Sequence, residues 1–204
     1  MTVQAAPNGS KKPQQFMVML VGKTHAGKTT FGKRLNRWLP SNTLIEPDDI
    51  SVFLSRHLPQ LYYRRYLAEY GHRYPKLKFQ LYFNIFRFAL SCRRNVTLTN
   101  NNIRRQRRVR IIKMARRHSA KTIMVFLDLP DRVLIQRIRR IRRPQKHFFE
   151  EKNFEDILLS KQNHQLNRPS SNEASYFLVA HKARELPRIE RRLRYIIKGL
   201  GYAV

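Results

Sequence analysis

Hydrophobic residues along the chain fall into short unbroken runs, and between these runs they recur every three or four positions. Unbroken runs predict buried strands of a parallel sheet, and the wider spacing predicts amphipathic helices. Strands are predicted at residues 16–21, 43–45, 95–99, 122–127 and 176–179. Because strands and helices alternate, the predicted fold class is α/β: a doubly wound parallel sheet of about five strands with helices on both faces.

The same pattern places the helices between these strands. They are predicted from the first strand to Pro40, within 51–94, over 103–117, over 131–143, within 145–172 and after Pro187. The asparagines at 100–102 are expected to cap the third of these helices, and Gly199 to end the last. Residues 16–204 are predicted to form a single domain that follows a disordered polar tail at residues 1–15.

A glycine-containing loop between the first strand and the first helix carries the strongest chemical signal. Residues 22–29 read Gly-Lys-Thr-His-Ala-Gly-Lys-Thr, a complete G-x-x-x-x-G-K-[ST] motif. In this position, backbone N–H groups and the positive helix end point at a polyphosphate. Lys28 is expected to reach the β- and γ-phosphates of ATP, and the Thr29 hydroxyl to hold Mg²⁺. The predicted ATP-binding residues are Gly22, Lys23, Thr24, His25, Ala26, Gly27, Lys28, Thr29 and Thr30.

Net charge points to the partner. The formal net charge is +29, from 42 Lys+Arg against 13 Asp+Glu, and a field of that size attracts polyanions such as nucleic acid. The alternatives are a chain from a basic proteome and a chain that binds an anionic lipid surface. Apolar runs fall short of the roughly 18 residues of a membrane span, and the single Cys92 excludes an internal disulfide framework. We therefore expect a cytoplasmic protein with no membrane segment; a homo-oligomer remains open.

Two acidic residues follow the second predicted strand. Asp48 lies twenty residues beyond Lys28, at the strand end where ligands bind in sheets of this kind. A carboxylate there can take the proton from an acceptor hydroxyl that attacks the γ-phosphate. The alternative is that Asp48 or Asp49 only caps the helix starting near Ile50. We predict that one aspartate is the base and the other the cap, with Asp48 as the base.

Together these motifs resemble the kinase domain of 5′-hydroxyl polynucleotide kinases, whose broader relatives include zeta-type toxins and small antibiotic or nucleoside kinases. The resemblance rests on the glycine loop, the Asp-Asp pair, and the pattern Val96-x-Leu98-x-x-x-Asn102 followed by an arginine-rich helix. It extends over residues 16–185, and only the glycine loop is individually specific. It implies transfer of the γ-phosphate of ATP to the 5′-hydroxyl end of RNA or DNA, with Asp48 as general base.

The chain departs from the family pattern at two positions. Thr99 stands where many members keep an acid that organises the metal, and Ser51 replaces an arginine commonly found three residues after the base. Arg56 is the residue expected to hold the acceptor phosphate in its place.

An arginine cluster follows the fourth predicted strand: Arg137, Arg139, Arg140, Arg142 and Arg143. Guanidinium groups folding over the γ-phosphate stabilise the charge that spreads there during transfer. The lid of the related kinases implies this role for Arg137, with Arg140 or Arg142 as the second lid arginine. The alternative is a solvated or RNA-facing basic helix. Asp128, at the end of the same strand, is either a Mg²⁺ ligand or part of the turn into the lid; we favour the turn.

Two further stretches bear on the acceptor. On the helix predicted at 103–117, Arg104 and Arg108 share a face that suits a sugar-phosphate backbone. Between the predicted second and third strands, Tyr62 and Tyr66 flank arginines, a composition typical of single-strand recognition by stacking. The alternatives are a kinase for a small molecule (a nucleoside, sugar nucleotide or antibiotic) and a nucleic-acid-binding protein with a nucleotide switch.

Overall fold

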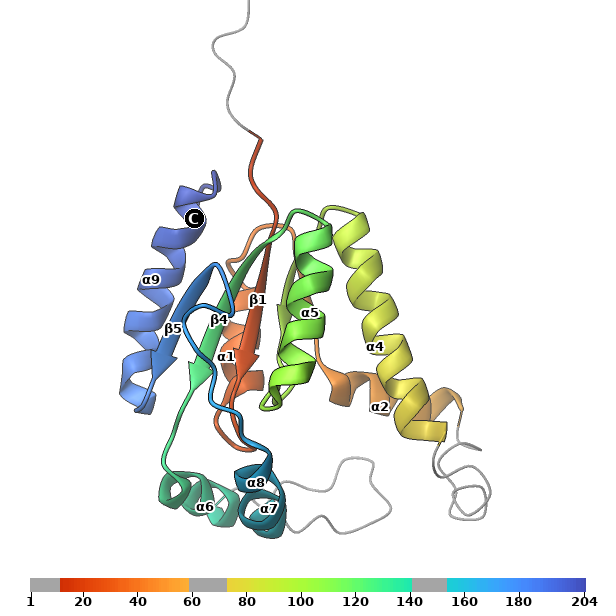
Figure 1. Ribbon diagram of the computed structural model, residues 1–204, viewed down its shortest axis with the longest axis vertical. Helices are drawn as coiled ribbons and strands as arrows, with labels where there is room; N and C mark the ends of the chain where they lie inside the picture. The colour runs from red at the N-terminus through yellow and green to blue at the C-terminus, as the bar shows by residue number, and fades with distance from the viewer. Residues whose placement is uncertain (1–11, 59–72, 141–153) are drawn as a thin grey trace, which may run out of the picture.

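Five parallel strands form one twisted sheet at the centre of the computed structural model, which describes residues 12–58, 73–140 and 154–204. The strand order is β2-β3-β1-β4-β5 (Figure 1). The strands are β1 (Phe16–Val21), β2 (Asn42–Ile45), β3 (Asn95–Leu98), β4 (Lys121–Leu127) and β5 (Tyr176–Ala180). The predicted fold class is confirmed: a five-stranded parallel sheet with helices around it.

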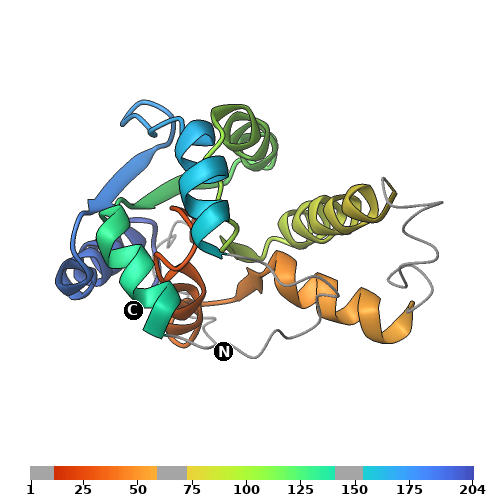
Figure 2. The same cartoon turned by 90° about the horizontal axis from the view of Figure 1, so that it is seen from below.

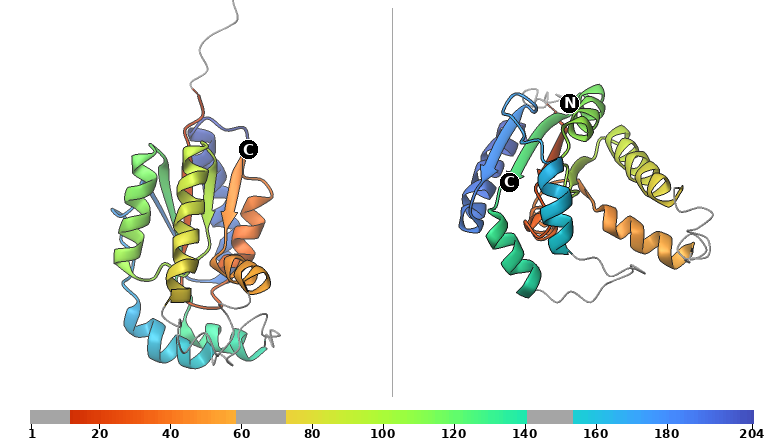
Figure 3. Two further views of the ribbon diagram at one scale, coloured as in Figure 1. Left: turned by 90° about the vertical axis from the view of Figure 1, so that its right-hand side faces the viewer. Right: turned by 60° about the horizontal axis from the view of Figure 1, so that its bottom comes forward.

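Helices cover both faces of the sheet. The helical segments are α1 (Lys28–Asn36), α2 (Pro47–His57), α4 (Arg73–Ser91), α5 (Arg105–Arg117), α6 (Asp131–Arg140), α7 (Phe154–Asp156), the π-helical η2 (Ile157–Gln162), α8 (Asn163–Gln165), the 3₁₀-helical η3 (Ala183–Glu185) and α9 (Leu186–Gly199). Figure 3 (left) shows the sheet between α5 on one side and α1 on the other. The short helices α6, α7 and α8 lie beyond the carboxyl ends of the strands (Figure 1).

Alternation along β1 divides the interior into two cores. Met17, Met19 and Val21 pack with residues of α4 and α5, while Phe16, Val18 and Leu20 pack with residues of α1 and α9. All six side chains are buried, as expected for a strand in the middle of a sheet that helices cover on both faces.

Two helices have the cores that their apolar spacing predicts. The apolar face of α9 is buried throughout: Ile189, Leu193, Ile196 and Ile197. In α4, Tyr82 and Phe86 are fully buried. Phe79 and Phe83 are half-buried, and the guanidinium groups of Arg107 and Arg110 lie over their rings, 4.6 and 4.5 Å from the ring centroids.

Two predicted helix starts are wrong. Helix α2 begins at Pro47, before the start of the predicted 51–94 stretch. The N-cap of α5 is Arg104 and not one of the asparagines; the first-turn N–H of Arg105 instead donates to the Asn167 Oδ1 atom at 3.3 Å. The last helix ends at Gly199 as predicted, although its C-cap residue is Leu200 and the left-handed residue that follows is Gly201 (φ 91°). Helix ends depend on turn geometry and on contacts with residues far away in the sequence, and the spacing of apolar residues encodes neither.

Across the three described ranges of the chain, no helix combines the length and the apolar character needed to cross a lipid bilayer.

Candidate active site

The glycine loop joins β1 to α1 at the carboxyl edge of the sheet. Its two glycines are required by geometry: Gly27 has φ 95°, and a Cβ atom on Gly22 would lie 2.9 Å from the Leu127 carbonyl oxygen. The Gly22 N–H donates to the Asn101 carbonyl at 2.9 Å. The loop therefore has a backbone conformation that residues with side chains rarely adopt. The hydrogen bond to Asn101 holds its first residue in place.

Protein groups already bind the polar atoms that a phosphate would use. The Lys28 ammonium donates to the Lys23 carbonyl at 2.6 Å, and the Thr24 N–H donates to Oε1 of the buried Gln162 at 2.7 Å. Lys23 itself forms an ion pair with Asp131 at 2.6 Å. The loop therefore contains amide and ammonium donors of the kind expected at a phosphate site, and in this structure protein oxygens accept their hydrogen bonds.

A segment from α7 to α8 covers this loop from outside the sheet. The rings of Phe154 and His25 meet edge to face with centroids 5.0 Å apart, and the Asn163 amide donates to Asp131 at 2.8 Å. Burial opposes ionisation of Asp131, but hydrogen bonds from Lys23 and Asn163 lower the pKa of its carboxyl below the usual value. Seen from below, α6 and this segment flank the loop between β1 and α1 (Figure 2).

Arg137, the predicted first lid arginine, contacts the glycine loop. Its Nη1 atom donates to the His25 carbonyl at 3.1 Å. Arg137 and Leu186 also border a hollow beside the start of α1, where loop residues and Arg34 complete the wall. The hollow is suited to the nucleoside part of a nucleotide whose phosphates lie on the loop.

The other arginines of the predicted lid differ in position. Arg139 is exposed and forms an ion pair with Glu155 at 2.8 Å. Arg140, the last residue of α6, is exposed. Arg142 and Arg143 lie outside the described residues.

The two aspartates lie in the first turn of α2. Asp48 is 83% exposed, and its carboxylate lies 3.4 Å from the ammonium of Lys78 on α4. Burial and the neighbouring Glu46 raise the pKa of the Asp49 carboxyl. The prediction that one aspartate caps this helix is wrong: Glu46 is the N-cap residue. Negative charge in a first turn is instead favourable through the helix dipole.

Glu46 is a candidate site residue that the sequence analysis missed. Its side chain is buried; Oε1 accepts a hydrogen bond from the Thr99 hydroxyl and Oε2 lies near the Lys33 ammonium, both at 3.4 Å. Lys33 is one helical turn after Thr29, so the Glu46 carboxylate lies on the Thr29 side of α1. The sequence did contain a signal: Glu46 is an acid directly after β2, and on the neighbouring strand Thr99 stands where many members of the resembled family keep an acid.

The oxygen atoms of Thr29, Thr99 and Glu46 are of the kind that Mg²⁺ binds. Hydroxyl and carboxylate oxygens are hard ligands, which this ion prefers. Within the described ranges, no group of three or more His, Cys, Asp or Glu residues could hold a metal by itself.

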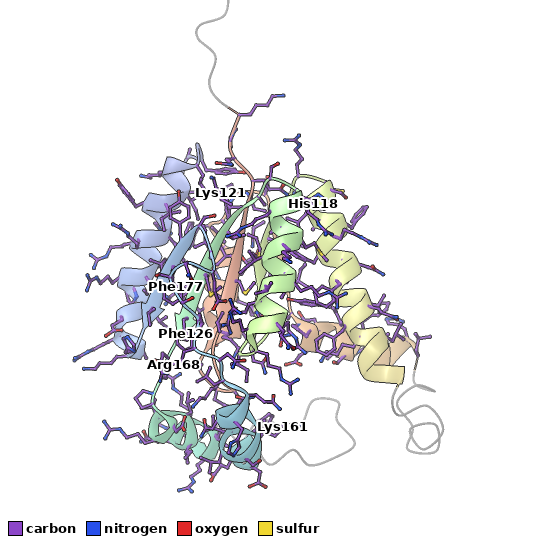
Figure 4. All side chains as sticks on the ribbon, in the orientation of Figure 1. His118, Lys121, Phe126, Lys161, Arg168 and Phe177 are labelled. Carbon is purple, nitrogen blue, oxygen red and sulfur yellow. The ribbon has the colours of Figure 1, made fainter. Side chains whose placement is uncertain are left out.

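Asp128 has partners of its own at the end of β4. Its carboxylate forms an ion pair with Arg168 and lies 3.5 Å from the His181 Nδ1 atom; Arg168 is labelled in Figure 4. Its N–H donates to the Ala180 carbonyl at 2.9 Å. These contacts favour the interpretation of Asp128 as part of the turn into α6.

The prediction that Arg108 contacts nucleic acid is wrong. The side chain is fully buried, and its Nε and Nη2 atoms donate to the Glu173 carboxylate at 2.7 and 2.8 Å. Its Nη1 atom donates to the carbonyls of Asn102 and Ile103. The Asn102 amide in turn donates to the Leu20 carbonyl at 3.0 Å, so Arg108 supports the strand that leads into the glycine loop.

The two remaining predicted acceptor residues that the structure describes, Arg56 and Arg104, are exposed. Arg104 is exposed, and its Nε atom donates to Gln165 at 3.2 Å. Arg56 is exposed in the last turn of α2, about 12 Å along the helix from Asp48 at 1.5 Å per residue. Tyr62 and Tyr66 lie outside the described residues.

Comparison with known proteins agrees with this architecture. The model of the AAA_33 family, described as an AAA domain, matches residues 17–165. No curated protein sequence matches the chain. Among solved structures, a kinase candidate from Chloroflexus aurantiacus superposes with a TM-score of 0.66 at 15% identity, over 92% of this chain and 98% of the other.

Two further structures resemble the chain. The APS kinase of Mycobacterium tuberculosis, in complex with AMPPNP and APS, has a TM-score of 0.53 at 13% identity, over 89% of this chain and 99% of the other. A chain of a Pnkp1/Rnl/Hen1 complex has a TM-score of 0.50 at 18% identity, over 72% of this chain and 46% of its own. At these identities the likeness shows the fold. The chain belongs to the AAA_33 family of AAA domains and has the α/β fold of P-loop kinases.

Proposed function

We propose that the protein is an ATP- and Mg²⁺-dependent kinase that transfers the γ-phosphoryl group to a hydroxyl of a small anionic molecule. One observation carries this proposal. The Asp48 carboxylate and the Lys78 ammonium lie 3.4 Å apart at the edge of the sheet that also carries the glycine loop. A base and a cation side by side suit an acceptor that has both a reacting hydroxyl and a negative charge.

Each residue of the site has a separate role in this proposal. Lys28 and the loop amides bind the phosphates, and Arg137 stabilises the charge that spreads over the transferring group. Asp48 takes the proton of the acceptor hydroxyl. The hydroxyl oxygen forms a bond to the γ-phosphorus, and the bond between the γ-phosphorus and the leaving ADP oxygen breaks. Thr29 and Glu46 would hold Mg²⁺, which neutralises charge on the phosphate oxygens when bound.

Two cations, Lys78 beside Asp48 and Arg107 near Lys78, support an anionic acceptor. The side chain of Lys78 is only 15% exposed, and burial lowers the pKa of its ammonium. Arg107 on α5 is half-buried over the Phe79 ring, and burial lowers its pKa as well. Two partly desolvated cations bind a phosphate, sulfate or carboxylate more strongly than solvated ones do. A structural neighbour that is an APS kinase in complex with AMPPNP and APS fits the same class.

The second candidate acceptor is the 5′-hydroxyl end of RNA or DNA. The observation in its favour is the formal net charge of +29, far more than a small acceptor needs. A structural neighbour that belongs to a polynucleotide kinase complex supports the same class.

One assay separates the two. The protein is incubated with γ-labelled ATP, Mg²⁺ and three acceptor groups: small anionic hydroxyl compounds, neutral nucleosides or sugars, and 5′-hydroxyl oligonucleotides. The Lys28→Ala variant is the control, because it lacks the phosphate-binding cation and should not transfer label. Preferred labelling of small anions supports the proposal, and preferred labelling of oligonucleotides supports the second candidate. A lack of transfer to every acceptor would contradict both.

A further inference from the structure

A groove runs along the free edge of the sheet, outside the proposed kinase site. β5 is an edge strand, and no other strand of the described residues pairs with its outer side. Helix α9 packs beside it (Figure 1), and Phe177, labelled in Figure 4, marks the strand. Two adjoining hollows follow the strand and the helix. Their lining includes Tyr176, Leu178, Arg188, Arg192, Tyr195 and Lys198.

The wall of this groove is positively charged. Arg188, Arg192 and Lys198 are exposed on α9. One carboxylate, Glu185, also lines the groove, and it accepts the N–H groups of His181 and Lys182 at 2.7 and 3.2 Å. These backbone hydrogen bonds lower the pKa of Glu185, so it stays ionised. Because three cations outweigh this one carboxylate, the groove attracts an anion.

An aromatic ring projects from the same wall. Tyr195 is 71% exposed, and the Arg192 guanidinium lies 5.5 Å from its ring centroid. The core does not require this ring, because the buried side of α9 is already formed by four aliphatic residues. Exposed aromatic rings and arginines are the groups on which single-strand-binding proteins stack nucleobases.

We propose that the β5–α9 groove binds single-stranded nucleic acid, with phosphates at Arg188, Arg192 and Lys198 and a base stacked on Tyr195. The site is separate from the kinase site. Leu186, at the start of α9, borders the nucleotide hollow, but Arg192 and Lys198 lie about 9 and 18 Å further along the helix. An acidic peptide would use the cations, but it would not need an exposed ring.

The binding test uses a fluorescent single-stranded oligonucleotide with a 5′-phosphate, which cannot accept a phosphoryl group at that end. Anisotropy is measured without ATP between about 50 and 200 mM salt, the range over which phosphate contacts weaken strongly. Tyr195→Ala, which removes no charge, should weaken binding about tenfold, within the range of one lost stacking contact. Tyr195→Phe should bind as the unsubstituted protein does. The double variant Arg192→Gln/Lys198→Gln should weaken binding and flatten the salt dependence.

A matched control removes the same charge from another surface. Arg87 and Arg93 are exposed on and just after α4, so Arg87→Gln/Arg93→Gln should leave oligonucleotide binding almost unchanged. Equal weakening by both double variants, with no effect of Tyr195→Ala, would overturn the proposal in favour of attraction by net charge alone. Tighter binding of a poly-glutamate peptide that depends on Tyr195 and Arg192 would overturn it in favour of a peptide site. Transfer to a small acceptor should be unaffected by Tyr195→Ala, so the two proposals fail separately.

Discussion

The Arg108 guanidinium and the Glu173 carboxylate form a buried ion pair with two parallel hydrogen bonds, 2.7 Å from Nε to Oε2 and 2.8 Å from Nη2 to Oε1. The pair joins α5 to the segment that precedes β5, 65 residues away in sequence. The third nitrogen of Arg108 binds the carbonyls of Asn102 and Ile103. Because the Asn102 amide binds the Leu20 carbonyl, the pair stabilises the chain on which the glycine loop is built.

Breaking this pair should be costly. Arg108→Gln leaves the Glu173 carboxylate buried without its charged partner, and the loss of one member of a buried pair costs about 3–5 kcal/mol of unfolding free energy. Urea unfolding followed by circular dichroism measures the change. Arg117→Gln, on the exposed side of the same helix, is the control and should stay within about 0.5 kcal/mol of the original protein. A loss as small for Arg108→Gln as for this control would refute the assignment.

Acid should destabilise the fold through the same pair. Burial by itself would raise the pKa of Glu173, but the hydrogen bonds and charge of Arg108 lower it below the ordinary value. In the unfolded chain a glutamate has its ordinary pKa of about 4.3. The unfolded chain therefore binds this proton at a higher pH than the folded chain does. The stabilisation is complete above that pH and is lost as pH falls through the folded pKa. Melting curves are recorded between about pH 3 and 7. The Glu173→Gln variant should have a lower melting temperature at neutral pH, but its melting temperature should fall less steeply in acid.

Sequence periodicity predicted the elements whose cause is local. The strands and α9 could be predicted because their apolar residues follow a regular pattern within a short stretch of sequence. The glycine loop could be predicted because its backbone conformation requires glycine at two positions with a fixed spacing, Gly22 and Gly27. The periodicity also placed Arg108 correctly on its helix but assigned the wrong environment. Its partner Glu173 is 65 residues away, and a charged residue is buried only where such a partner exists.

The same limit explains the site residues that were missed. Gln162 contacts the Thr24 N–H from 138 positions away, and a lone glutamine has no motif. Glu46 stood beside the more conspicuous aspartates, and its importance depends on Thr99 lying opposite on β3. Asp48 was selected from its position after the second strand and Arg137 from the resemblance, and their roles remain predictions.

The choice of base can be tested by comparing the two aspartates. Asp48→Asn should retain ATP binding and lower kcat by about 10²–10⁴-fold, the usual effect of removing a general base. Asp49→Asn is the matched variant, with the same chemical change one residue later, and should reduce kcat less. Single-turnover measurements at saturating ATP report the transfer step directly. A larger loss for Asp49→Asn would show that Asp49 is the base.

Glu46 should affect the metal rather than the proton. Glu46→Gln keeps the size of the side chain and its hydrogen bond from Thr99, but it removes the negative charge near Thr29. The Mg²⁺ concentration that half-saturates nucleotide binding should therefore rise about 10- to 100-fold, as for residues that support metal ligands. The readout is the titration of a fluorescent ATP analogue with Mg²⁺, which does not depend on transfer. An unchanged Mg²⁺ requirement would exclude Glu46 from the metal site.

Arg137 should contribute more to the transition state than to ATP binding. Its guanidinium already lies on the loop, 3.1 Å from the His25 carbonyl, and its contact with the phosphate should strengthen as charge develops during transfer. Arg137→Ala should therefore lower kcat by a larger factor than it raises the Kd for ATP. Arg132→Ala, at an exposed position on the same helix, removes an equal charge and should change neither. If Arg137→Ala weakens ATP binding and kcat stays the same, Arg137 acts only in binding the nucleotide, and the lid role falls to another arginine.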